Sequence, residues 1–135
     1  MASATDDDAQ HLRLLSIFHY IVGGMMGLFG CFPIIHFVVG IAALSGAMNN
    51  GNGPPAAFGW IFITVAVAVM TFMWSVAIAI ILAGPKLRDR TGYTYCVVVA
   101  AVECTFMPFG TVLGVLTLIV LMRPSVKAAF GVSAT

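Results

Sequence analysis

The feature that most constrains this chain is a long stretch without formal charge. Between Arg13 and Lys86 there is no Asp, Glu, Lys or Arg, and the only basic side chains are two histidines. Charged residues make up about a quarter of a typical soluble chain, against 8% of this one. Hydrocarbon favours such a sequence, because a charge placed there costs roughly 3 kcal/mol or more. The sequence therefore predicts an integral membrane protein.

Polar segments divide the apolar sequence into three blocks. A polar N-terminal tail, a segment rich in Asn, Gly and Pro, a basic loop and a C-terminal tail separate or flank the blocks. Because lipid offers no hydrogen-bond partners to the backbone, we expect each block to be helical. The tails are 1–11 and 123–135, the Asn/Gly/Pro segment is 48–55, the transmembrane domain is 12–122, and its blocks are 12–48, 58–83 and 93–122.

Two internal prolines leave the number of crossings open. The block 58–83 has the length of one crossing and is predicted to end at Gly84-Pro85, ahead of a basic loop at 86–90. Each of the other blocks contains a proline, Pro33 or Pro108. Proline interrupts the helical hydrogen-bond ladder and disfavours helix at the preceding residue. Each proline therefore marks either a kink in one long helix or the turn of a hairpin.

The positions of the basic residues favour one topology. All six Lys and Arg residues face the cytoplasm if the first block crosses once and the third block folds back at 107–110. We therefore predict an all-α membrane bundle of four helical segments, with the N-terminus, the 86–90 loop and the C-terminus in the cytoplasm. One alternative is three long, proline-kinked transmembrane helices. Another is two intramembrane hairpins, made by the first and third blocks, flanking a single span.

Glu103 is the only acidic residue in the apolar blocks. An ionisable group at membrane depth is costly to keep there, so it is a candidate functional residue, although a protonated Glu that hydrogen-bonds a neighbouring helix is equally consistent with the sequence. His36 lies about as close to Pro33 as Glu103 lies to Pro108, which makes an acid–imidazole pair of these two possible. His19, nearer the cytoplasmic end, is the other candidate polar residue.

Metal binding has little support in the sequence. Cys31, His36 and Cys104 are weak candidate ligands for zinc or copper, but their spacing matches no recognised metal motif. The three cysteines form no disulfide framework. We predict no metal and no other cofactor.

Small residues recur at helical spacing and predict close packing between helices. Gly23 and Gly27 share one face, Gly110 and Gly114 share another, and Ser75 opens a similar four-residue step in the second block. Such faces let helix backbones approach closely. The partner could be the same chain, a second copy or another protein.

Both ends of the chain resemble a known group of proteins. The segment 108–127, beginning Pro-Phe-Gly-Thr-Val-Leu-Gly, and the segment 12–20, Leu-Arg-Leu-Leu-Ser-Ile-Phe-His-Tyr, are similar to the ends of small multispanning inner-membrane proteins of bacteria to which no activity is assigned. The resemblance implies a bacterial inner-membrane location. It carries no catalytic or binding residue over to this chain.

These observations favour a non-enzymatic membrane protein. The sequence contains no nucleophile-plus-base or phosphate-loop motif, and its net charge of +1 gives no reason to expect nucleic acid. We expect a protein that packs through its Gly- and Ala-rich faces, as a homo-oligomer or as an accessory subunit of a larger membrane complex. The alternatives are an oligomeric ion or proton channel or small transporter that uses Glu103 and His36, and a membrane-shaping hairpin protein.

Overall fold

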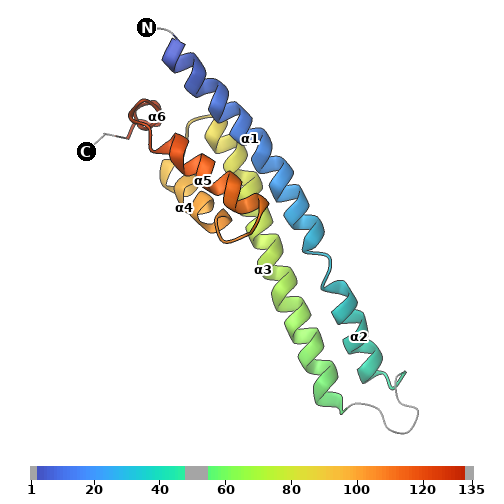
Figure 1. The fold of residues 1–135 in the computed structure, drawn as a ribbon. Coiled ribbons are helices and arrows are strands. Elements are labelled where there is room, and N and C mark those ends of the chain that lie inside the picture. Colours follow the sequence, from blue (N-terminus) through green and yellow to red (C-terminus); the bar gives the residue numbers. More distant parts are fainter. Residues whose placement is uncertain (1–2, 48–54, 133–135) are drawn as a thin grey trace. The chain divides into compact units, whose positions relative to one another are not determined.

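Helix is the only regular secondary structure in the described part of the chain. The computed structural model describes residues 3–47 and 55–132, and these contain helices and no strand (Figure 1). The prediction of an all-α chain is therefore confirmed. The predicted Asn/Gly/Pro segment lies almost wholly outside the described residues. The helices are α1 (Ser3–Phe29), α2 (Ile34–Leu44), α3 (Ala56–Arg88), α4 (Tyr93–Glu103), α5 (Phe109–Leu121) and α6 (Pro124–Ala129).

The helices form two compact units. Unit 1 consists of Met1–Gly24 and Ala77–Thr135, and unit 2 consists of Met25–Val76. The long helices α1 and α3 each contribute one end to unit 1 and the other end to unit 2. All six Lys and Arg residues belong to unit 1, and unit 2 contains no Asp, Glu, Lys or Arg.

Two stretches are long and apolar enough to cross a membrane, by length and composition. One extends over 39 residues of α1 and α2, and the other is the 33-residue α3. By contrast, α4 and α5 have 11 and 13 residues, about 16 and 20 Å of helix. Neither reaches across a hydrocarbon layer of about 30 Å.

In unit 2 the chain keeps its direction past Pro33. Gly30 lies against Trp74, and Gly40 lies against Ile63. As the residue numbers rise along the first block, those of the contacted residues in α3 therefore fall. The segment α2 therefore continues along α3 in the direction set by the end of α1. Pro33 marks a break in one antiparallel path, and the alternative of a hairpin in the first block is wrong.

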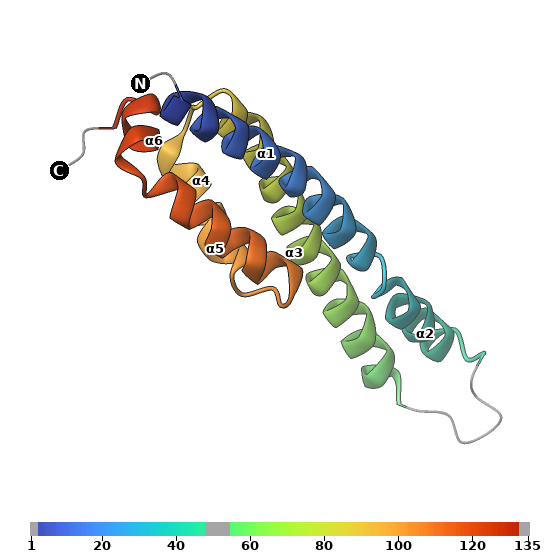
Figure 2. The same ribbon diagram turned by 45° about the horizontal axis from the view of Figure 1, so that its top comes forward.

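Pro108 has the opposite role in unit 1. It precedes α5, which packs side by side with α4 in the reverse direction (Figure 2). Gly114 lies against the backbone of Ala100 and Cys104, and Gly110 lies against the carbonyl of Glu103. The alternative of three long kinked helices is therefore wrong for the third block, which is a hairpin.

The end of the second block also differs from the prediction. Helix α3 continues through Pro85 to Arg88, so only residues 89–92 remain as a loop. Proline removes one backbone donor, but its carbonyl still accepts, and the Asp89 amide donates to it at 2.8 Å. Leu87, in the added turn, is completely buried in the core of unit 1. We attribute the continued helix to that burial, which offsets the lost hydrogen bond.

The core of unit 1 includes the C-terminal tail. Tyr93 anchors the tail, because its hydroxyl donates to the carbonyl of Leu121 and its ring meets Phe130 edge-on. Helix α6 thereby becomes part of the packed unit, although the sequence alone predicts a tail there. The buried core residues are Leu12, Leu15, Leu87, Cys96, Leu113, Val120, Leu121 and Val126.

The outer surface carries far more large apolar side chains than that of a soluble protein. Leu28, Phe32 and Met107 are 76%, 66% and 85% exposed, and many other large apolar side chains lie on the outside. His19 and Glu103, in contrast, are completely buried. Exposed apolar surface on this scale is rare in soluble monomers.

We expect Gly114→Ala to destabilise the protein. A Cβ at this position would lie 2.8 Å from Sγ and 2.9 Å from the backbone nitrogen of Cys104, so α4 and α5 would have to separate. Overpacking of this kind costs about 1–3 kcal/mol. Thermal unfolding of the purified protein in detergent measures the effect.

The matched control is Gly24→Ala in the same unit. A Cβ there meets nothing within 4 Å, and alanine is favoured over glycine in a helix by about 1 kcal/mol. We expect this variant to be at least as stable as the wild type. Equal melting temperatures for the two variants would contradict the close α4–α5 contact.

Candidate functional site

His19 is presented by the buried face of α1. Leu12, Leu15 and Ser16 precede it at seven, four and three residues, and all three are buried, so the four residues share one helical face. The Nδ1 atom of His19 lies 2.8 Å from the carbonyl oxygen of Leu15, one turn earlier. That carbonyl can only accept, so Nδ1 carries the hydrogen and donates it.

Glu103 is positioned by the α4–α5 hairpin. It is the last residue of α4, and its carbonyl accepts a hydrogen bond of 2.9 Å from the amide of Phe106 in the turn. The close contact at Gly110 holds the start of α5 against the same carbonyl. The backbone at Glu103 is therefore fixed from both sides of the hairpin.

The structure brings the side chains of His19 and Glu103 together. Nε2 of His19 lies 3.3 Å from Oε1 of Glu103, and both side chains are completely buried. The contact is longer than a typical hydrogen bond to a charged group, and neither Nε2 nor the two carboxyl oxygens has a hydrogen-bond partner among the described residues. This pair of an acid and a base, shielded from water, is the strongest candidate site in the described chain.

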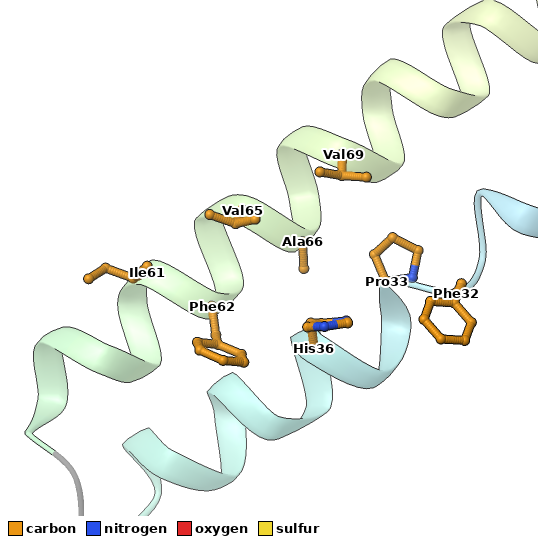
Figure 3. Close-up of a pocket in the computed structure, with 8 residues that line it drawn as sticks. All are labelled: Phe32, Pro33, His36, Ile61, Phe62, Val65, Ala66 and Val69. Carbon is orange, nitrogen blue, oxygen red and sulfur yellow. The ribbon is translucent and has the colours of Figure 1, made fainter. Parts of the chain in front are cut away.

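His36, a possible partner of Glu103 by sequence position, lies in unit 2. Its ring stacks on Phe62 with a centroid distance of 6.0 Å and lies 6.3 Å from Phe32. Figure 3 shows it projecting from α2 toward α3 in an otherwise apolar cavity of about 340 Å³. The cavity is lined by Phe32, Pro33, His36, Ile61, Phe62, Val65, Ala66 and Val69.

The three weak candidates for metal ligands do not form a site. The Cys31 thiol donates to the carbonyl of Gly27, His36 stacks on an aromatic ring, and Cys104 packs against Gly114. Among residues 3–47 and 55–132 no three His, Cys, Asp or Glu side chains are grouped so that they could hold a metal ion.

The predicted glycine faces have unequal roles. Gly23 lies against Ile80 and Ile81 of α3, and Gly110 and Gly114 lie against α4, so these three act in packing within one chain. Gly27 has no atom within 4 Å of a Cβ placed on it. Of this face, only Gly23 therefore packs against another helix.

A second polar cluster ties the two ends of the chain together in unit 1. Asp8 of α1 accepts hydrogen bonds from the hydroxyl of Ser125 and from the guanidinium of Arg123, the latter at 3.0 Å. The Ser125 hydrogen bond, followed by Arg123, lowers the pKa of the Asp8 carboxyl below its ordinary value. Sequence reasoning missed this cluster, since Asp8 and Ser125 are separated by almost the whole chain.

The comparisons with known proteins identify no relative. The chain matches no protein-family model, no curated protein and no solved structure.

The lowered pKa of Asp8 predicts a small acid sensitivity. A carboxyl whose pKa is lower in the folded state stabilises the fold above its unfolded pKa and loses this contribution as pH falls through the folded value. We expect wild-type stability to fall on acidification by up to about 1 kcal/mol more than that of Asp8→Ala, because the pair is partly exposed. Unfolding curves of both proteins over an acid pH series measure the difference.

The control for this measurement is Asp89→Ala, which removes a carboxylate from an exposed loop position. It should retain the acid sensitivity of the wild type. If Asp8→Ala retains it as well, the Asp8 cluster does not contribute to stability.

Proposed function

We propose that the protein is a small, non-enzymatic integral membrane protein of the bacterial inner membrane that associates through helix faces, as a homo-oligomer or as an accessory subunit of a larger complex. Support for membrane insertion comes from the buried His19–Glu103 pair beneath a largely apolar exterior. Hydrocarbon solvates apolar side chains and penalises unpaired polar ones, which matches this distribution. The resemblance at both ends of the sequence supports the bacterial setting.

The proposed topology places the basic end of unit 1 in the cytoplasm. In Figure 2 the start of α1 and helix α6 lie together, at the end of unit 1 away from the turn of the α4–α5 hairpin. The Asp8–Arg123 contact joins α1 to the start of α6 at that end. Lys and Arg are enriched on the cytoplasmic side of membrane proteins, so both termini and the loop after α3 face the cytoplasm in this proposal.

In this topology the hairpin enters the membrane from the cytoplasmic side and turns within it. Its two helices are too short to cross, and the turn carries apolar side chains: Met107 is 85% exposed and Phe109 is 63% exposed. Apolar residues at a turn are stable in hydrocarbon and unfavourable in water.

A half-inserted hairpin also occupies one leaflet more than the other, which favours membrane shaping as a second candidate function.

A spin label on Met107→Cys tests the depth of the hairpin turn. We expect the label in reconstituted membranes to be reached by oxygen, which dissolves in lipid, and to be protected from water-soluble relaxation agents on either side. The control is a label on Arg90→Cys in the exposed loop, which should be reached by the water-soluble agent. Access of that agent to position 107 from the side opposite the Arg90 label would show that the two arms cross the bilayer, and would overturn the proposed topology.

Association is supported by a face of α3 that nothing in unit 2 covers. Thr64, Ala68, Thr71 and Ser75 follow one another at steps of four, three and four residues, and all are exposed. Small residues at this spacing allow a second helix to approach closely. Gly23, Gly110 and Gly114 are already packed within the chain, which leaves this α3 face as the best candidate for contact with another copy.

The mass of the purified complex tests association. We expect the wild type, extracted in mild detergent, to exceed the 14.2 kDa of one chain and Ala68→Leu to shift toward the single-chain mass. The added side chain would keep the second helix at a distance. Val69→Leu is the matched control, because residue 69 lies about 100° further around the helix, and its mass should equal that of the wild type.

Either of two results would contradict the association proposal. A wild-type mass of one chain, without co-purifying proteins, would refute association altogether. An unchanged complex in Ala68→Leu would show that another surface is used. A stoichiometric partner lost in Ala68→Leu but kept in Val69→Leu would make the protein an accessory subunit.

The alternative of an oligomeric channel or transporter has less support. It requires Glu103 and His36 to line a pore between copies. Glu103 is completely buried within one copy and faces His19, and His36 is stacked against Phe62.

A further inference from the structure

The polar atoms of the His19–Glu103 pair require a shared proton. Because Nδ1 of His19 donates to the carbonyl of Leu15, the atom that faces Glu103 is Nε2. In a neutral imidazole with this tautomer, Nε2 is an acceptor, and an ionised carboxylate is also an acceptor. Two acceptors 3.3 Å apart repel each other unless one of them carries a hydrogen.

Counting protons gives one favourable state. With no proton between Nε2 and Oε1, the pair has a buried charge of −1 and no donor. With two protons it has a buried charge of +1, carried by an imidazolium beside a neutral acid. With one proton the pair has no net charge and can form one hydrogen bond. A buried charge without a partner is strongly destabilising, so the packed unit selects the state with a single proton.

The proton belongs on the carboxyl group. The alternative, a carboxylate beside an imidazolium, separates charge in a buried site and needs further donors to the carboxylate oxygens. Oε2 of Glu103 has no hydrogen-bond partner among the described residues. A carboxylic acid that donates to Nε2 leaves one neutral carbonyl oxygen without a partner, which is less costly than leaving a charged one.

The elements around the pair offer no competing charge. Helix α5 contains no titratable residue, and its buried Thr117 donates its hydroxyl to the carbonyl of Leu113. On α4, the hydroxyls of Tyr93 and Tyr95 donate to backbone carbonyls of α5 and α3, and the Cys96 thiol lies near the carbonyl of Thr91.

The Lys and Arg side chains that the structure describes in unit 1 form no salt bridge with the pair. Lys86 of α3 lies over the ring of Tyr95, and Arg123 contacts Asp8. Arg13, Arg88 and Arg90 are exposed, and Lys127 lies in α6. Within the described residues, the salt bridges include no partner for Glu103 other than His19.

The chemistry of the pair favours a proton over a metal cation. Hard cations take about six or more oxygen ligands, whereas the pair offers one carboxyl group and one imidazole nitrogen. A proton needs only two partners, and two are present.

In the proposed topology, both groups lie at a depth where an unpaired charge is most costly and the state with a single proton is most strongly favoured. His19 follows Asp8 by eleven residues along α1, about 16 Å of helix. Glu103 ends the 11-residue α4, again about 16 Å from its start near the basic loop. In the proposed topology, on which this placement depends, both side chains lie close to the middle of a hydrocarbon layer of about 30 Å.

We propose that His19 and Glu103 form an intramembrane proton-binding site, in which one proton is held by the Glu103 carboxyl group and donated to Nε2 of His19, joining α1 to the α4–α5 hairpin. Removal of this proton by hydroxide leaves a carboxylate and water. Addition of a second proton from hydronium converts His19 to imidazolium. Either change leaves a charge in the site and favours separation of the hairpin from α1.

Carbon-13 labelling tests where the proton resides. Glu103 is the only glutamate in the chain, so glutamate labelled at the side-chain carboxyl carbon reports on this group alone. We expect the solid-state NMR signal of the full-length protein in phospholipid bilayers to be that of a protonated acid at neutral pH and to change to that of a carboxylate in strong alkali. A carboxylate signal at neutral pH would overturn the proposal.

Thiol labelling tests the link between the proton and helix packing. Cys96 is completely buried in the core of unit 1, so a membrane-permeant maleimide should reach it only when the packing opens. We expect its labelling rate in the wild type to rise at least about tenfold in alkali after division by the rate for the denatured protein at the same pH, which cancels the ionisation of the thiol itself. An unpaired buried charge favours opening of the packing by more than the free energy of a tenfold change. Mass spectrometry of each cysteine follows the labelling.

Glu103→Gln provides the decisive variant. The glutamine amide can donate to Nε2 of His19 as the protonated carboxyl does, but it cannot lose the proton. We expect slow Cys96 labelling at neutral pH and no increase in alkali once the rate is divided by that of the denatured protein at the same pH. His36→Gln is the matched control in unit 2 and should behave as the wild type. Fast labelling of Glu103→Gln at neutral pH, or an alkaline increase equal to that of the wild type, would refute the link.

A different experiment tests the proposed membrane location. Release of the protein from membranes by an alkaline carbonate wash would contradict that location. The NMR signal of Glu103 and the Cys96 labelling rates test the His19–Glu103 pair itself.

Discussion

The close approach of α5 to α4 underlies the arrangement of unit 1. Where Gly110 and Gly114 face α4, the absence of side chains lets the two backbones meet directly. This contact folds the third apolar block back on itself, buries Leu113 and Leu121 in the core, and holds the end of α4 in place. The position of Glu103 beside His19 depends on it, because Glu103 stands at the point where the hairpin turns. Two positions without a side chain thus determine where the one buried acid lies.

Much of the secondary structure could be predicted from the sequence, because apolar blocks separated by Gly, Pro and charged residues have few other solutions. The same physical rules left Pro33 and Pro108 equivalent, and the structure distinguishes them by the contacts of the helix after each proline. After Pro108, two glycines four residues apart create a surface on which α4 can pack. After Pro33, α2 contacts α3 through Gly40, and the chain keeps its direction. Local pattern ends the helix at Pro85, whereas α3 continues to Arg88, because the burial of Leu87 is a tertiary contact that local pattern does not show.

The candidate site was half predictable. Glu103 stands out as the one acid in the apolar blocks, but distance from a proline, taken as a measure of depth, points to His36 as its partner. That rule fails because Pro33 interrupts a path that continues, whereas Pro108 reverses one. A better signal was available in α1, where His19 continues the buried face of Leu12, Leu15 and Ser16. The Asp8–Ser125 contact had no comparable signal, since it joins opposite ends of the chain through a helix of only six residues.

The hydroxyl groups along α3 have a consequence for how long any complex persists. Thr64, Thr71 and Ser75 each donate to the carbonyl of their own helix one turn earlier, at 2.7–2.8 Å. Their hydrogens are therefore satisfied whether the face meets lipid or another helix. Separation of two such helices breaks no hydrogen bond and leaves none of these hydroxyls without a partner. Contact between the helices is therefore readily reversible. In the proposed membrane location, the fraction of chains in a complex would follow the concentration of the protein in the plane of the membrane, and the amount of protein that the cell makes would set its state of assembly.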